Sequence, residues 1–323
     1  MIKLLVITGP TASGKTGLGV ALAEKLDGEI ISADSMQIYR GMEIGTAAAT
    51  EEERRGIPHY MIACKDPAEE YSVSAYRQEA EGIIKDIARR GKLPIVVGGT
   101  GMYIDALLYD MNYTSAGKNE ELRREFAAFA EENGTQALHE RLRQVDPESA
   151  EKLHKNDVKR IIRALEIFYL SGSSKSSQRQ EIKIKPYLSP VIISLECSDR
   201  QYLYDRIDRR VDSMMQQGLP DEVRALLEAG VPADAQSMKA IGYRQLVPCL
   251  MGEADLGQAV EQIKKESRHY AKRQLTWMRR RDCLRLDIAG KTAEQLLSEA
   301  LDLPPVAALG ATRTQNGCMD KEN

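Results

Sequence analysis

The sequence contains few of the residues that build metal sites and disulfide frameworks. Five cysteines and four histidines occur in 323 residues, and no two cysteines form a C-x-x-C pair. Their scattered positions and odd number fit neither a zinc site nor a set of disulfides. We therefore predict reduced thiols that fill space in a cytoplasmic protein. The cysteines are Cys64, Cys197, Cys249, Cys283 and Cys318.

Long apolar runs and an excess of charge of one sign are also missing. No uninterrupted apolar run approaches the roughly 18 residues that cross a bilayer, so we expect no membrane-spanning segment. Lysine and arginine total 45, aspartate and glutamate total 48, and the net charge is −3. This balance excludes a uniformly basic coat for nucleic acid but allows a local basic surface. The length favours two domains, or one domain with an insertion.

The N-terminal third of the chain alternates apolar strands with amphipathic helices. Buried strands are predicted at Lys3–Thr8, Glu29–Ala33 and Leu93–Val97, each a short run rich in branched residues. Apolar residues recur with helical spacing over Lys15–Leu26 and Ser72–Arg90, which lie between these strands. Such alternation predicts an α/β fold in three layers, with a parallel sheet covered by helices on both faces.

The pattern changes after residue 113. From Asn119 to Leu170 we find helical periodicity and no strand. Gly134 is predicted to break one helix, Asp146-Pro147 to start another and Gly172 to end a third. A strand-like run at Pro190–Leu195 indicates that the sheet resumes. The predicted organisation is an α/β core of residues 1–113 and 186–302, an all-helical insertion at residues 114–185, and a disordered tail at residues 303–323.

The most specific motif follows the first predicted strand. Residues 9–16 match G-x-x-x-x-G-K-[ST] and lead into a predicted helix, the context that this phosphate-loop motif requires. Its glycines let successive backbone N–H groups converge on phosphate oxygens, and the helix N-terminus adds a positive dipole. The lysine adds a mobile cation, and the threonine hydroxyl can ligate Mg²⁺. We predict a diphosphate site made of Gly9, Pro10, Thr11, Ala12, Ser13, Gly14, Lys15 and Thr16.

Two further strand ends are predicted at the same edge of the sheet. Asp34 follows the second strand, and ligands of open parallel sheets lie beyond the carboxyl ends of the strands. Its carboxylate could bind Mg²⁺, act as a general base or cap the next turn. Gly98-Gly99-Thr100-Gly101 ends the third strand, where Thr100 can donate to a phosphate. The residue pattern leaves these alternatives open.

Positive charge gathers in two segments of this nearly neutral chain. Lys264–Arg281 contains eight Lys or Arg residues and one Glu. A second basic cluster in the insertion comprises Lys152, Lys155, Lys159, Arg160 and Arg163. Solvated helix faces often look like this, but two such clusters in a chain of net charge −3 favour a surface for RNA or DNA phosphates.

Seven motifs occur together and in order along the chain. They are GPTASGKT at residues 9–16, DSMQIYR at 34–40, MEIGT at 42–46, GGTGMY at 98–103, NDVKRIIRALE at 156–166, IGYRQL at 241–246 and KRQLTW at 272–277. In this combination the sequence resembles the tRNA dimethylallyltransferase family, the tRNA isopentenyltransferases of bacteria. The resemblance extends from about residue 3 to residue 287.

The resemblance implies a prenyl transfer. A dimethylallyl group would move from dimethylallyl diphosphate to the exocyclic N6 amine of the adenosine on the 3′ side of a tRNA anticodon, position 37. Asp34 matches the general base, and Thr100 matches a residue near the reacting centre. Lys15 and Thr16, with Mg²⁺ as cofactor, would stabilise the leaving diphosphate, which Arg210 would also reach.

The same resemblance implies the partners of the protein. It would act as a cytoplasmic monomer on the anticodon stem-loop of tRNA, with the target base extruded from its stack. The residues that match tRNA-contacting positions are Asp34, Ser35, Met36, Gln37, Thr100, Arg123, Lys159, Arg160, Arg163, Lys239, Arg268, Lys272, Arg273 and Gln274.

Two alternatives remain for the phosphate loop. A small-molecule kinase also places such a loop and a strand-end aspartate at one crevice, but it would use ATP and a short lid. A non-catalytic, NTP-dependent RNA-binding protein would need a second acidic strand end to position water and Mg²⁺. The strand Leu93–Val97 is instead followed by Gly-Gly-Thr, which argues against hydrolysis.

Overall fold

The computed structural model describes residues 1–110, 119–174, 176–177 and 183–311. The chain forms two compact units. The first unit combines Met1–Leu108 with Lys185–Asn323, and the second is Tyr109–Ile184. The two units are described separately below.

A six-stranded parallel sheet forms the centre of the first unit. The strands are β1 (Ile2–Thr8), β2 (Gly28–Ser32), β3 (His59–Tyr60), β4 (Leu93–Gly98), β5 (Leu188–Glu196) and β6 (Leu284–Asp287). Their order is β3-β2-β4-β1-β5-β6, and every pair is parallel. Strand β1 therefore lies between β4 and β5, and the carboxyl ends of β1, β2 and β4 share one edge. Because both faces are covered, the central strands are continuous apolar runs.

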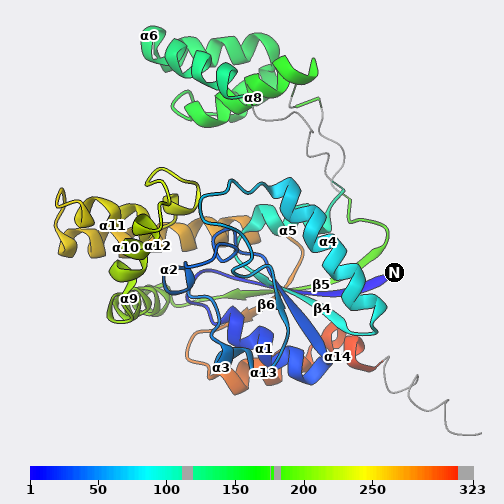
Figure 1. Ribbon diagram of the computed structural model, residues 1–323. Coiled ribbons are helices and arrows are strands. Elements are labelled where there is room, and N and C mark those ends of the chain that lie inside the picture. Colours follow the sequence, from blue (N-terminus) through cyan, green and yellow to red (C-terminus); the bar gives the residue numbers. More distant parts are fainter. Residues whose placement is uncertain (111–118, 175, 178–182, 312–323) are drawn as a thin grey trace, which may run out of the picture. The chain divides into compact units, whose positions relative to one another are not determined.

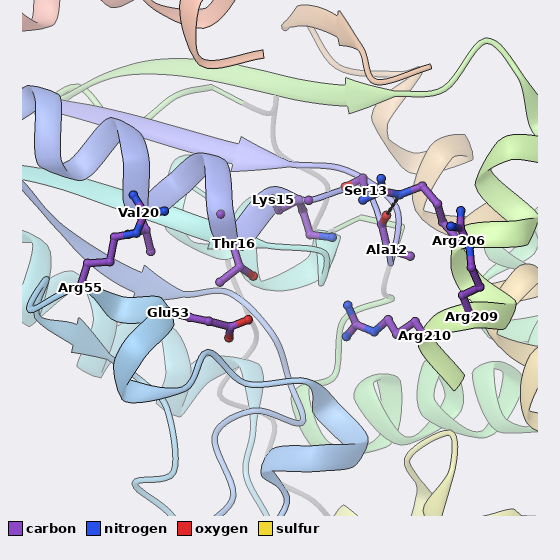
Figure 2. Close-up of a pocket in the computed structure, with 12 residues that line it drawn as sticks. Ala12, Ser13, Lys15, Thr16, Val20, Glu53, Arg55, Arg206, Arg209 and Arg210 are labelled. Carbon is purple, nitrogen blue, oxygen red and sulfur yellow. Dashed lines mark hydrogen bonds between the residues drawn. The ribbon is translucent and has the colours of Figure 1, made fainter. Parts of the chain in front are cut away.

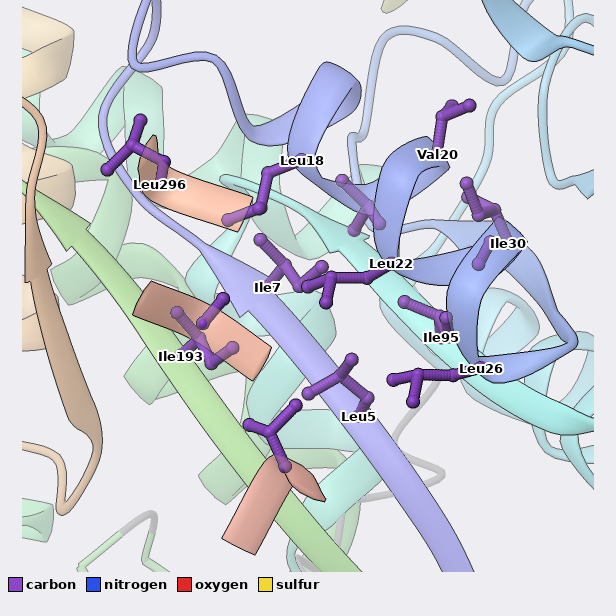
Figure 3. Packing of buried hydrophobic residues seen from close by; sticks show 14 of the residues in the cluster. Leu5, Ile7, Leu18, Val20, Leu22, Leu26, Ile30, Ile95, Ile193 and Leu296 are labelled. Carbon is purple, nitrogen blue, oxygen red and sulfur yellow. The ribbon is translucent and has the colours of Figure 1, made fainter. Parts of the chain in front are cut away.

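Helices cover both faces of this sheet (Figure 1). One face is packed against α1 (Lys15–Leu26), α13 (Ala293–Asp302) and α14 (Pro304–Ala311), and the other carries α4 (Val73–Arg89) and α5 (Gly101–Leu108). Figure 3 shows the core under α1, where Leu5 and Ile7 of β1 meet Leu18, Leu22 and Leu296. The predicted three-layer α/β fold is confirmed. The remaining helices of the unit are α2 (Glu43–Thr46), α3 (Glu51–Arg54), α9 (Arg200–Gln216), α10 (Leu219–Glu228), η1 (Ser237–Lys239), α11 (Tyr243–Leu250) and α12 (Leu256–Met278).

The prediction of a disordered tail from residue 303 is wrong for Pro304–Ala311, which form α14. Two adjacent prolines argued against a helix, but proline is well accommodated in the first turn, where its missing N–H needs no partner. Val306 and Leu309 lie three residues apart on one helix face, and both are buried in the core beside α13. Residues 312–323, the rest of the predicted tail, lie outside the described residues.

The second unit is helical in its described part. It contains α6 (Glu120–Val145), α7 (Pro147–Lys152) and α8 (Val158–Ser171), packed around Phe126, Leu142 and Leu165. The three local predictions are confirmed: Gly134 interrupts α6 at φ 84°, Asp146 caps α7, and Gly172 ends α8 at φ 68°. Its boundaries, Tyr109 and Ile184, compare with the residues 114–185 expected for the insertion.

Candidate active site

The phosphate loop connects β1 to α1, as its motif requires. Gly9 packs so tightly that a Cβ there would lie 2.9 Å from both the Leu195 Cβ and the Ser13 Oγ. Gly14 adopts φ 89°, a conformation that side chains other than glycine rarely accept. No side chain among the described residues caps α1, whose first turn begins at Lys15. The first N–H groups of this helix are therefore available to an anion.

A cavity of about 630 Å³ opens beside this loop. Figure 2 shows Lys15 and Thr16 on one side of it and three arginines of α9 on the other. Arg206 Nε donates to the Ala12 carbonyl at 2.8 Å, so α9 is tied directly to the phosphate loop. The cavity has five cationic lining residues, Lys15, Arg55, Arg206, Arg209 and Arg210, and one acidic lining residue, Glu53. This excess of positive charge favours a polyanion such as a diphosphate.

Two of these cations are poorly solvated. Burial, together with the positive charge of Arg210, lowers the pKa of Lys15 to about 7, and the Asp34 carboxylate opposes that shift. Burial also lowers the pKa of Arg210, against the attraction of Asp34 and Glu53. Lys15 Nζ donates to the Pro10 carbonyl at 2.7 Å. An anion in the cavity would stabilise both positive charges and relieve their mutual repulsion.

Asp34 and Thr100 meet at the edge where β2 and β4 end. The Ser35 N–H donates to Thr100 Oγ1 at 3.0 Å, and the Thr100 N–H donates to the Ala33 carbonyl at 3.0 Å. A Cβ at Gly98 would lie 2.3 Å from that carbonyl oxygen, so glycine is required for this approach. The Met36 N–H donates to Asp34 Oδ1 at 2.9 Å, so this carboxylate caps the turn after β2.

Two smaller cavities link Asp34 to the phosphate loop. One, of about 60 Å³, is lined by Asp34 together with Lys15, Thr16 and Arg210. The other, of about 240 Å³, is lined by Asp34, Arg210 and apolar side chains that include Ile207, Val211, Met214 and Ile263. Arg210 therefore borders all three cavities. The structure brings the predicted base and the predicted diphosphate site together in one crevice.

Gln274 of α12 is buried and bridges the loop and the sheet. Its Oε1 accepts from the Thr11 N–H at 2.8 Å, and its Nε2 donates to the Gly99 carbonyl at 3.0 Å. A Cβ at Gly99 would lie 2.0 Å from that Nε2. The resemblance placed Gln274 among the tRNA contacts; here its amide bonds within the chain, and it positions the phosphate loop against the end of β4.

The other predicted tRNA contacts in the first unit differ in exposure. Lys239, Lys272 and Arg273 are exposed, and Lys239 and Arg273 border the 240 Å³ cavity. Arg268 instead makes two bonds of 2.5 and 2.7 Å to Asp208 of α9. Ser35, Met36 and Gln37 are half-buried and border the cavities next to Asp34.

In the second unit the predicted contacts are also of two kinds. Lys159 and Arg160 are exposed on α8, and Arg160 pairs with Asp157 at 3.0 Å. Arg123 and Arg163 both bind Glu166, which is completely buried. Glu166 thus holds these two guanidinium groups in fixed positions. The pKa of Glu166 is lowered by hydrogen bonds from both arginines, although burial acts in the opposite direction.

The residues of the site that were not predicted from the sequence include Glu53, Arg55, Arg206, Arg209 and His59. Arg206 lies one helical turn before Arg210, and this i,i+4 spacing was the signal that could have indicated it. His59 Nδ1 donates to the Ile57 carbonyl at 2.8 Å, while its buried Nε2 has no partner among the described residues, although His59 borders the 60 Å³ cavity. Glu222 of α10 lines none of the three cavities, and no pattern in the neighbouring sequence predicts its bonds to Ile44 and Gly45.

The described residues contain no cluster of three or more His, Cys, Asp or Glu side chains suited to a metal ion. Thr16 borders both the largest and the smallest of the three cavities, so its hydroxyl is placed as a single ligand beside the anion site. Magnesium commonly takes one or two protein ligands and completes its shell with substrate phosphates and water. No helix in the described part of the chain is long and apolar enough to cross a membrane.

This fold and site define a phosphate-loop α/β enzyme in which the loop and the strand-end carboxylate of Asp34 border the same cavity. Residues 37–281 match the family model described as IPP transferase. The tRNA dimethylallyltransferase of Thermoanaerobacter sp. strain X514 is 47% identical over 286 residues, which cover 88% of this chain and 91% of the relative. That of Bacillus cytotoxicus is 49% identical over 297 residues, covering 91% and 93%. The chain belongs to the IPP transferase family.

Solved structures show the same fold. The tRNA isopentenylpyrophosphate transferase of Bacillus halodurans is 41% identical, with a TM-score of 0.70 and coverage of 98% of this chain and 99% of that one. A eukaryotic dimethylallyltransferase, solved acting on tRNA, is 31% identical with a TM-score of 0.78, covering 98% of this chain and 80% of that one.

Proposed function

We propose that this enzyme transfers a dimethylallyl group from dimethylallyl diphosphate to the exocyclic N6 amine of adenosine 37, next to the anticodon of tRNA. The observation that carries the proposal is the shared crevice. The phosphate loop, Arg210 and Asp34 border cavities that share lining residues, and β4 is followed by Gly99 and Thr100 without a carboxylate. This arrangement supports a leaving diphosphate and an incoming nucleophile, and it disfavours the kinase and NTP-dependent alternatives.

The phosphate loop would bind the diphosphate through Gly9–Thr16, with Lys15 and Arg210 on opposite sides of it. Negative charge grows on this group as the carbon–oxygen bond breaks, so cations already in place lower the barrier. A bound Mg²⁺, held by the Thr16 hydroxyl and the phosphates, would supply further charge stabilisation. Because the two cations are poorly solvated without a ligand, they gain most when the anion binds.

Asp34 would accept a proton from the amine. The lone pair of an adenine amine is delocalised into the ring, so removing a proton as the new carbon–nitrogen bond forms makes it a better nucleophile. The Met36 N–H holds Asp34 through Oδ1, and no bond from a described residue to Oδ2 is present. Thr100 positions the Asp34 turn through its bond with Ser35.

The tRNA would be held by exposed cations on both units. The exposed cations that would meet phosphates are Lys159 and Arg160 of α8, and Lys239, Lys272 and Arg273 of the first unit. Arg123 and Arg163 would present guanidinium groups already oriented by Glu166. Since tRNA is the substrate, the site of action would be the cytoplasm.

The test is direct. The purified protein is incubated with unmodified tRNA, Mg²⁺ and dimethylallyl diphosphate, without nucleotide, and the nucleosides are analysed by mass spectrometry. We expect prenylated adenosine to appear in step with released pyrophosphate. Transfer that occurs only with ATP, or ATP cleavage at a comparable rate without the prenyl donor, would contradict the proposal and favour a kinase or NTPase.

A further inference from the structure

Glu222 of α10 makes a concentrated set of bonds that the reaction described above does not use. Its Oε2 accepts from the Ile44 N–H at 2.7 Å, and its Oε1 accepts from the Gly45 N–H at 2.9 Å. The Tyr243 hydroxyl of α11 also donates to Oε1, at 2.5 Å. One carboxylate therefore joins α10 and α11 to α2, which lies 178 residues earlier in the sequence.

The element that Glu222 holds is α2, a helix of four residues. A helix this short is not stable by itself, and the N–H groups of its first turn need acceptors. Glu222 supplies two of these acceptors. Gly45 also packs against the Tyr243 ring, where a Cβ would lie 2.4 Å from Cε2. The position of α2 thus depends on α10 and α11.

The other end of α2 holds Arg210. The Thr46 carbonyl accepts from Arg210 Nη2 at 3.2 Å and from Gln37 Nε2 at 3.3 Å. Among the described residues, Arg210 has no carboxylate within ion-pair distance. A carbonyl orients a guanidinium without neutralising it, so Arg210 keeps its charge for an anion.

We propose that Glu222 is a positioning residue for the donor site. Through α2 it fixes the Thr46 carbonyl, and this carbonyl sets the direction of Arg210 across the cavity from the phosphate loop. The inference rests on the proposed function, because it assigns Arg210 to the diphosphate. It adds a chain of contacts, from Tyr243 through Glu222 and α2 to Arg210, that runs from the IGYRQL segment to the leaving group.

The test uses Glu222→Gln, which keeps the size of the side chain. The amide nitrogen cannot accept from a backbone N–H, so at least one bond to α2 or to Tyr243 is lost. We expect the KM for dimethylallyl diphosphate and the Kd for inorganic pyrophosphate to rise together by about 5- to 10-fold, the size of one ordinary hydrogen bond. The KM for tRNA should stay within about twofold.

Two controls separate positioning from general loss of structure. Glu228→Gln makes the same charge change at an exposed position on α10 and should leave the pyrophosphate Kd unchanged. Tyr243→Phe removes only the hydroxyl and should raise the Kd less than Glu222→Gln does. It also provides the test if Glu222→Gln does not fold.

The decisive measurement is made in an Arg210→Ala background. If Glu222 acts through Arg210, Glu222→Gln will cause no further rise in the pyrophosphate Kd there. An equal rise in both backgrounds, or an unchanged Kd in a folded Glu222→Gln protein, would overturn the inference.

Calorimetry of pyrophosphate binding needs neither tRNA nor turnover. Wild-type protein that binds no pyrophosphate would overturn the proposed function itself, whereas equal binding by wild type and variant would overturn only the role of Glu222.

Discussion

At the scale of single residues, the site depends on where charge is kept and where it is neutralised. Arg268, Arg123 and Arg163 are paired with carboxylates, whereas Lys15 and Arg210 bond only to carbonyl oxygens among the described residues. A carboxylate fixes each cation of the first group in place, whereas the second group has no carboxylate partner among the described residues and borders a cavity. Lys15 and Arg210 would therefore gain a counter-ion only when an anion enters the cavity.

Asp34 supports the first prediction. Asp34→Asn keeps the bond from the Met36 N–H but removes the base, so turnover should fall by about 10²- to 10⁴-fold. Binding of tRNA, measured by filter retention or fluorescence anisotropy, should change little. Asp234→Asn, at an exposed position, is the matched control. Near-normal turnover in Asp34→Asn would rule out the assigned role.

Lys15 supports a prediction about pH. Its pKa of about 7 leaves it largely neutral at higher pH in the free protein, and a bound diphosphate would raise that pKa again. Binding of dimethylallyl diphosphate at about pH 8 should therefore take up a proton, and less so at about pH 6, where Lys15 is already charged. Calorimetry in two buffers of different ionisation enthalpy measures this uptake. The same uptake in Lys15→Ala would show that another group titrates.

At the scale of elements, glycines at the end of β4 allow this strand end to approach the end of β2 and helix α12 closely. Gly98 lets β4 approach Ala33, and Gly99 leaves room for the Gln274 amide. The glycines of GGTG were predictable as a tight strand end. Their partners were not, because Gln274 lies 175 residues away from Gly99.

Helix α14 supports a stability prediction that reverses the expectation from the sequence. Leu309→Ala removes a buried side chain from the core and should lower the free energy of unfolding by about 2 kcal/mol. The loss cannot exceed the free energy that docks α14, since the terminal helix can detach by itself. Thermal or urea denaturation measures the change. Ala307→Ser, on the exposed side, should change stability by less than about 0.5 kcal/mol, and equal effects of the two would show that α14 is not docked.

At the scale of the whole molecule, the net charge is only −3, but the positive charges are concentrated on particular surfaces. Cations surround the phosphate-loop cavity and also occupy the exposed faces of α8 and α12. Each phosphate contact releases counterions, so a polyanion should bind with a steep dependence on salt.

The last prediction follows from this segregation. The affinity for tRNA should fall about tenfold or more between dilute and physiological salt, and the combined Lys159→Ala and Arg160→Ala changes should flatten that slope by about 1–2. The KM for dimethylallyl diphosphate should not change. Lys25→Ala, an exposed lysine near the end of α1, serves as the control. An affinity that is independent of salt would contradict a phosphate-binding surface.

The sequence by itself determined the local features of this protein. The phosphate loop, the strands that flank it, the helix stops at Gly134 and Gly172 and the cap at Asp146 all depend on residues within a few positions of one another. Backbone geometry and periodic burial act at that range, so the α/β fold and the positions of Lys15 and Asp34 were predictable.

Only the tertiary structure decided which distant groups meet. Arg206 reaches Ala12 across 194 residues, and Glu222 reaches Ile44 across 178. It also determined that α14 is packed, because Val306 and Leu309 are buried only when α13 and the sheet provide a surface. No pattern in the sequence predicts such contacts, because burial and hydrogen bonding depend on neighbours in space rather than along the sequence.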